Sequence, residues 1–114
     1  MLHKDLRVIK KIMQRIDAVN GYCRGLSYQD FADNTMLTEA CVFNLLQVGE
    51  MCNQELSDSL KKKYNKIPWH QIYGLRNRIV HGYDDVKLII IWETISEDLP
   101  KLHSELANIL SQIT

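Results

Sequence analysis

The sequence predicts an all-α fold, a small antiparallel bundle of helices. Apolar residues recur every three or four positions over most of the chain, the period of a helix with one buried face. Serine, asparagine, proline and glycine, which begin and end helices, separate these stretches. The length of 114 residues suits one domain with one core, so we expect a single helical domain over residues 1–114.

The first predicted helix starts close to the N-terminus. It ends at Asn20 and Gly21, a pair typical of a helix C-terminus. Its apolar face consists of Leu2, Leu6, Ile9, Ile12, Ile16 and Val19. Ser27 is placed to cap a short helical turn that runs through Phe31.

A second long helix follows, for which Asn34 or Thr35 can serve as the N-terminal cap. Its apolar residues recur at helical spacing, so we expect this helix to lie at the centre of the core. They are Leu37, Cys41, Leu45, Val48, Cys52 and Leu56.

Residues 57–66 are polar and include Lys61, Lys62 and Lys63. We expect these lysines to form a solvated face. Pro68 suits the first position of the next helix, because its fixed φ and missing N–H are tolerated there. That helix carries Trp69, Ile72, Leu75 and Ile79 as its apolar stripe and ends near Gly82.

The run from Asp85 to Trp92 is open to two interpretations. Its β-branched and aromatic residues are typical of a strand. We favour a helix, because a single strand would have no sheet to join and the later apolar residues keep helical spacing. Pro100 then marks a kink or a new start, with Ser96 as a candidate cap. The apolar set includes Val86, Ile89, Ile90, Ile95, Leu99, Leu102, Leu106, Ile109 and Leu110.

The charge balance limits the partners. With 14 basic and 14 acidic residues the chain lacks a broad basic field, so contact with nucleic acid must come from a local patch. The longest apolar run, Leu88 to Trp92, is far too short to span a bilayer. The N-terminal residues lack the apolar centre of a secretory signal, and we therefore expect a cytoplasmic protein without a membrane segment.

The cysteines and most histidines suggest neither disulfides nor a metal site. Cys23, Cys41 and Cys52 are odd in number and contain no Cys-x-x-Cys pair, and we expect the last two to share a buried helix face. The remaining candidate ligands, His3, His70 and His103, stand far apart without a neighbour at ligand spacing.

The densest group of chemically active side chains lies at the end of the helix that follows Pro68. Arg76, His81 and Tyr83 provide a permanent cation, an imidazole that titrates near neutrality and a phenol. Cleavage of RNA without a metal needs a base for the 2′-hydroxyl, an acid for the leaving 5′-oxygen and a cation for the charge on phosphorus. Arg76 and His81 match these needs in kind.

A structural interpretation of the same residues is also open. Arginine and histidine near a helix C-terminus are favoured by the helix dipole, and Gly82 is an ordinary helix stop. Arg76 and His81 also lie about 140° apart around an intact helix, and one imidazole cannot act as base and acid at once. A working site therefore needs a second copy across a two-fold axis, or a helix that unwinds at His81.

The string Arg76-Asn77-x-x-x-His81-x-Tyr83 resembles the motif of the HepT family of HEPN toxins. The flanking residues extend this resemblance over most of the chain. They are Leu45 to Glu50, Ile67-Pro68-Trp69, Gly74-Leu75, Ile91-Trp92 and Asp98-Leu99-Pro100-x-Leu102.

The resemblance implies an all-α homodimer that acts as a metal-independent ribonuclease toxin without a cofactor. Its antitoxin would be a small nucleotidyltransferase of the MNT type, which transfers AMP to Tyr83. The catalytic residues carried over are Arg76 and His81, with Asn77 in support. Arg78 would widen the positive patch.

Three points stay open at this stage. Glu50 can face the site and orient His81, or it can be a solvated helix residue. The helical dimer can also be a non-catalytic module that binds a nucleotide or a partner transferase. Alternatively, this copy can be the inert half of a stable complex.

Overall fold

The computed structural model describes residues 3–83 and 86–113, and this part of the chain is almost entirely helical, with no strand. The predicted all-α, antiparallel arrangement is confirmed. The elements are α1 (His3–Cys23), α2 (Tyr28–Ala32), α3 (Thr35–Glu50), η1 (Met51–Glu55), α4 (Asp58–Lys63), α5 (Trp69–Gly82), α6 (Leu88–Glu93), η3 (Thr94–Asp98) and α7 (Leu99–Ile113). The segments η1 and η3 are π-helical.

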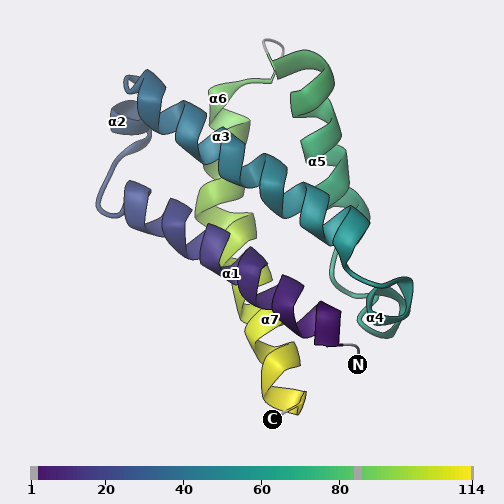
Figure 1. Ribbon diagram of the computed structural model, residues 1–114. Helices are drawn as coiled ribbons and strands as arrows, with labels where there is room; N and C mark the ends of the chain where they lie inside the picture. Colours follow the sequence, from purple (N-terminus) through teal and green to yellow (C-terminus); the bar gives the residue numbers. More distant parts are fainter. Residues whose placement is uncertain (1–2, 84–85, 114) are drawn as a thin grey trace.

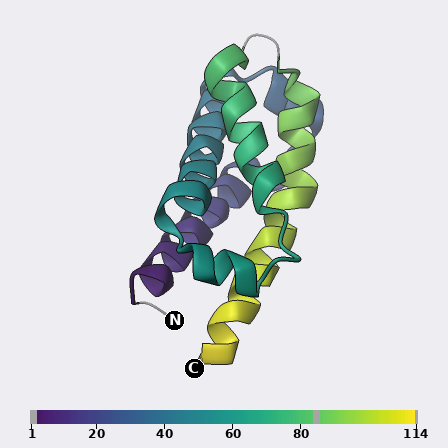
Figure 2. The same ribbon diagram turned by 90° about the vertical axis from the view of Figure 1, so that its right-hand side faces the viewer.

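Helix α3 lies between α1 on one side and α5 on the other, as Figure 1 shows. Helices α6 and α7 form one long rod with η3 between them, and this rod crosses behind α1 and α3 (Figure 1). The N-terminal end of α1 and the C-terminal end of α7 lie at one end of the molecule, and the C-terminal end of α5 lies at the other (Figures 1 and 2). None of the described helices is long and apolar enough to cross a membrane.

The first helix is longer than the sequence predicts. It continues through Asn20 and Gly21 to Cys23, and the chain turns afterwards at Gly25, whose φ is 75°. The predicted end at Asn20 and Gly21 is therefore wrong, because the glycine that takes the left-handed conformation is the later one. The face from Ile9 to Val19 is buried as predicted, whereas Leu2 lies outside the described residues.

The caps of the next two helices are confirmed. Ser27 forms a capping box with Asp30 at the start of α2, and Asn34 accepts a hydrogen bond from the backbone of Leu37 at the start of α3. Backbone and side-chain hydrogen bonds from Ser27 hold the pKa of the exposed Asp30 carboxyl below its ordinary value. Beyond Glu50 the long helix widens into the π-helical segment η1.

Helix α4 has no counterpart in the sequence prediction. The Ser57 side chain caps it by accepting from the backbone of Leu60, and the backbone N–H of Ser57 donates to the buried Asp5 carboxylate at 2.9 Å. The Ser57 hydroxyl also donates to Asp5, at 2.6 Å. Lys61 is not the solvated residue that was predicted, because its ammonium donates to the Asn53 carbonyl at 2.9 Å and satisfies a helix-end acceptor.

The helical interpretation of the stretch after Val86 is confirmed, whereas the details around Pro100 differ. Ser96 does not cap a helix, since it lies inside η3, and Pro100 is the second residue of α7 in a rod that does not break. Proline lacks an N–H and its ring clashes with the carbonyl four residues earlier in an α-helix. The wider π-helical turn directly before Pro100 relieves this clash, as π-bulges commonly do at such points.

The three cysteines lie in the core, as predicted for Cys41 and Cys52. The sequence did not predict that Cys23 meets Cys41, with their sulfur atoms 3.7 Å apart as free thiols. Burial raises the pKa of Cys52 from its ordinary 9.0 to about 12, and it does the same for Cys41. These thiols are therefore neutral packing groups at physiological pH.

Candidate functional site

Helix α5 carries the candidate site and is packed shallowly on the bundle. Pro68 is the N-cap of this helix and not, as the sequence predicts, its first residue, because the helix begins at Trp69. The Trp69 indole N–H donates to the Tyr64 carbonyl at 3.1 Å. Ile79 is the one fully buried residue of this helix, all of whose residues are described. A cavity of about 300 Å³ separates α5 from η3 and α7, with Leu75 on its wall. The face of α5 that points away from the cavity and from α3 is thus free to present side chains.

Arg76 lies where α5 approaches α3 most closely. A Cβ atom added to Gly49 would lie 2.5 Å from the Arg76 Cβ and 2.9 Å from its Cγ, so only a glycine permits this approach. The Arg76 Nη2 atom lies 2.9 Å from Oε2 of Glu50, the residue after that glycine. The Tyr73 ring lies on another side, with its centroid 5.8 Å from the Arg76 Cζ. The close approach at Gly49 therefore fixes the start of the Arg76 side chain, and Glu50 and Tyr73 hold its guanidinium.

His81 lies in the last turn of α5 and is exposed. It stands five positions after Arg76, about 140° away around the helix, and no ion pair or side-chain hydrogen bond joins the two among the described residues. Asn77 is half-buried and one turn before His81, within about 40° of it. The helix remains intact at His81, so a single chain presents the two groups on different faces.

Arg78 and Tyr83 occupy different surroundings. Arg78 lines the cavity beneath α5 together with Arg76, Asp98 and Glu105, although the two arginines start about 160° apart around the helix. The structure thus brings Arg76 and Arg78 to the wall of one cavity. Tyr83 is 38% exposed and keeps helical dihedrals, φ −53° and ψ −41°, so the chain has not yet left the helix there.

Glu50 is the site residue whose partner the sequence did not predict. It pairs with Arg76, and not with His81. The signal was present in Gly49, since a glycine inside a helix is unfavourable by about 1 kcal/mol relative to alanine and often marks a close approach of another element. The neighbouring helix that makes this approach cannot be identified from spacing within α3. The role of Tyr73 was missed for the same reason.

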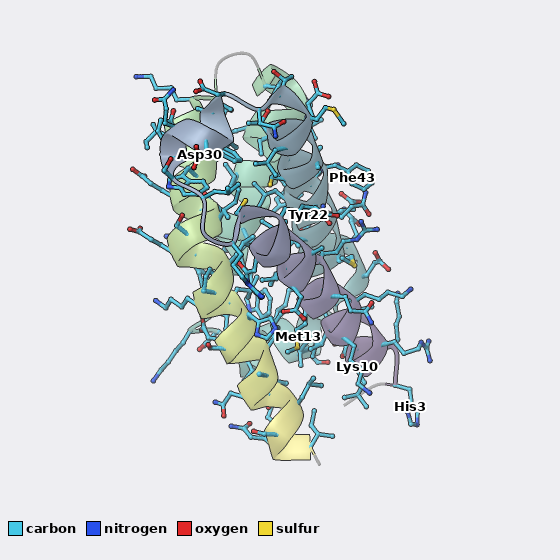
Figure 3. All side chains as sticks on the ribbon, turned by 90° about the vertical axis from the view of Figure 1, so that its left-hand side faces the viewer. His3, Lys10, Met13, Tyr22, Asp30 and Phe43 are labelled. Carbon is cyan, nitrogen blue, oxygen red and sulfur yellow. The ribbon has the colours of Figure 1, made fainter. Side chains whose placement is uncertain are left out.

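The helices that carry the Arg76–Glu50 pair, α3 and α5, also carry exposed apolar side chains. Met36 and Phe43 of α3 are 83% and 51% exposed, and Val80 of α5 is 48% exposed. Met36, Phe43 and Glu50 recur every seven residues and so share one stripe of α3. Figure 3 shows Phe43 projecting from α3 on the side away from α7.

The histidines outside this helix end do not form a ligand cluster. Among residues 3–83 and 86–113, no three His, Cys, Asp or Glu side chains lie close enough together to hold a metal ion. His103 instead lies 3.0 Å from the Asp17 carboxylate and links α7 to α1. His3 and His70 are exposed.

Comparison with known proteins identifies the family. The family described as Ribonuclease HepT-like matches residues 9–109, which include the whole of α3 and α5. This chain belongs to the HepT-like ribonuclease family.

Relatives with ribonuclease names cover nearly the same length. "Putative RNase TTE0752" of Caldanaerobacter subterraneus subsp. tengcongensis is 33% identical over 104 residues, 91% of this chain and 92% of the relative. "Putative RNase MJ1380" of Methanocaldococcus jannaschii is 28% identical over 94 residues, 82% of this chain and 85% of the relative. "Probable ribonuclease HepT" of Thermococcus cleftensis is 25% identical over 88% of each chain. No solved structure matches this chain significantly.

Proposed function

We propose that this protein is a metal-independent endoribonuclease that serves as the toxin of a HEPN/MNT toxin–antitoxin pair. The observation that carries the proposal is that one helix of a HepT-like fold carries both a guanidinium held in place, Arg76, and an exposed imidazole, His81. A guanidinium binds phosphate oxygens, and an imidazole moves protons near neutral pH. The names of the relatives support RNA as the substrate class.

The proposed reaction needs two copies of His81. One imidazole removes the proton of an RNA 2′-hydroxyl while its oxygen bonds to the neighbouring phosphorus. The P–O5′ bond breaks, and the second imidazole donates a proton to the leaving 5′-oxygen. The products are a 2′,3′-cyclic phosphate and a 5′-hydroxyl. Arg76 stabilises the negative charge that grows on the phosphate oxygens, and Asn77 is the supporting residue beside His81.

A homodimer joined through the α3 and α5 surface would supply the second copy. Met36 and Phe43 are exposed apolar residues on the same stripe of α3 as Glu50, and exposed Val80 lies one turn after Arg76 on α5; exposed apolar side chains of this kind commonly mark a protein interface. In a two-fold dimer the same patch meets itself, which brings the two α5 helices together. The second His81 would then reach the phosphate held by the first chain's Arg76.

The partner of the proposed toxin is a nucleotidyltransferase of the MNT type. The Tyr83 phenol oxygen would attack the α-phosphorus of ATP, pyrophosphate would leave, and a base of the transferase would take the phenolic proton. Tyr83 is exposed at the end of the molecule away from the termini, which leaves it accessible to such an enzyme. The added AMP would bring bulk and negative charge beside the groups that bind RNA phosphate.

Incubation with labelled transfer RNA in the presence of a chelator tests the proposed activity. We expect cleavage by the wild-type chain and by a control Arg24→Ala variant, since Arg24 is exposed at the far end of α1. Arg76→Ala and His81→Ala should each lose cleavage by at least about a hundredfold, the usual contribution of one catalytic group. RNA that binds but is not cut by the wild-type chain would favour a non-catalytic binding module and overturn the proposal.

A further inference from the structure

We infer that Glu50 is a positioning residue for the reaction, which holds the Arg76 guanidinium in the orientation that binds the scissile phosphate. This inference rests on the proposed function, and it assigns a role to the contact between α3 and α5. The structure gives it three independent supports: the glycine beneath Arg76, the carboxylate beside it and the aromatic ring on another side.

The glycine sets the backbone position of Arg76. A Cβ at Gly49 would meet the Arg76 Cβ and Cγ, and the Arg76 Cβ is fixed by the α5 backbone and cannot swing away. The α3 and α5 backbones thus meet at this residue pair. The next residue of α3, Glu50, then lies within 2.9 Å of the guanidinium that it approaches.

The carboxylate sets the orientation of the guanidinium. It contacts Nη2, so the other N–H groups of the guanidinium remain for a phosphate. The Arg76 and Glu50 side chains are 24% and 40% exposed, and an ion pair this open to water contributes little to stability. The ion pair therefore contributes mainly by restricting the orientation of the guanidinium, because an arginine side chain without a partner samples many rotamers.

The charge of Glu50 makes the inference testable. A carboxylate beside Arg76 repels RNA phosphate, so its removal should not weaken substrate binding. If Glu50 positions the guanidinium for the transition state, removal should lower kcat and leave KM equal or lower. A residue that only stabilised the fold would lower the apparent kcat no further than the folded fraction falls, so kcat is expressed per folded protein, measured by circular dichroism.

The experiment compares Glu50→Gln and Glu50→Asp with Glu97→Gln, a control on an exposed residue of η3, away from the outer surface of α3 and α5. We expect Glu50→Gln to lower kcat on RNA at least about tenfold without raising KM, while Glu50→Asp recovers part of the loss. Glu97→Gln should match the wild type. An unchanged or increased kcat in Glu50→Gln would overturn the inference, and an increase would show that Glu50 restrains Arg76.

A second measurement separates this inference from the proposed activity. The Arg76 side-chain signals in ¹⁵N NMR should show a restricted guanidinium in the wild type and a freely rotating one in Glu50→Gln. If the guanidinium is restricted but the wild-type chain cleaves no RNA, the proposed function is refuted, whereas the contact between Glu50 and Arg76 is supported. Equal mobility in both proteins would overturn the positioning role whatever the activity.

Discussion

At the residue scale, the two groups proposed for catalysis differ in how the chain holds them. Arg76 is fixed by Gly49, Glu50 and Tyr73, whereas His81 is exposed and has no such contacts among the described residues. A phosphate-binding group benefits from a fixed position, since electrostatic stabilisation depends on preorganisation. In the proposed dimer, His81 acts on a phosphate that is bound by Arg76 of the other chain, so contacts with that chain can set the position of the imidazole.

Tyr83 offers a prediction at the same scale. Tyr83→Phe should keep RNA cleavage within about twofold of the wild type, because phenylalanine preserves the ring and its packing. It should gain no AMP when incubated with the cognate MNT-type transferase and ATP, because the phenol oxygen is gone. Intact-mass spectrometry measures the addition. Tyr22→Phe, which removes another exposed phenol, serves as the control and should still be modified. A mass increase on Tyr83→Phe would refute Tyr83 as the acceptor.

At the element scale, the register between α3 and α5 depends on one glycine. Gly49→Ala should destabilise the fold by about 1–3 kcal/mol, the usual cost of overpacking, because Arg76 Cβ cannot move away without its helix. Cleavage should fall further than the folded fraction does, since the guanidinium shifts with α5. Urea denaturation and initial rates measure the two effects.

Gly74→Ala is the matched control for that substitution. Gly74 lies in the middle of α5, and an added Cβ there meets nothing within 4 Å. Alanine should therefore stabilise the helix by up to about 1 kcal/mol and leave cleavage unchanged. Equal effects of the two substitutions would show that the close approach at Gly49 has no special role.

The buried thiol of Cys52 predicts a dependence of stability on pH. An unfolded thiol ionises near 9.0, whereas burial keeps the folded Cys52 neutral to about 12. Its contribution to stability is thus complete below pH 9 and is lost as the pH rises toward 12, with about 2 kcal/mol gone near pH 10.5. Urea denaturation between pH 8 and 10.5 should show a steeper decline for the wild type than for Cys52→Ala. Parallel declines would contradict this prediction.

The long helices could be predicted from sequence because their apolar periodicity and caps are local signals. This holds for α1, α3 and α5, and for the rod from α6 to α7. Helix α4 escaped prediction because only one of its six residues, Leu60, is apolar, and its cap is held by Asp5, 52 positions earlier in the chain. The π-helical segments also lack a local signature.

The candidate site was predictable in composition and only partly in arrangement. Arg76, His81, Asn77 and Tyr83 follow from a short motif on one helix. The pairing of Glu50 with Arg76 depends on how two helices meet, and that register is set by packing between elements that spacing within one helix does not encode. Arg78 lines the same cavity as Arg76, and its part in a positive patch stays a prediction.

At the scale of the whole molecule, the exposed apolar surface of α3 and α5 and the separation of Arg76 from His81 point to the same proposal. One chain carries the cation and the imidazole on different faces, and a two-fold partner would complete the site. The ribonuclease would then exist only as an assembly.

The most direct test adds inert His81→Ala subunits to a fixed amount of wild-type protein, allows the subunits to exchange, and measures RNA cleavage per wild-type chain. If each site uses His81 from both chains, mixed dimers are inactive. The rate per wild-type chain should fall to about half with an equal amount of the variant and to about one tenth with about a ninefold excess. An unchanged rate at that excess, with mixed dimers present by native mass spectrometry, would contradict a shared site.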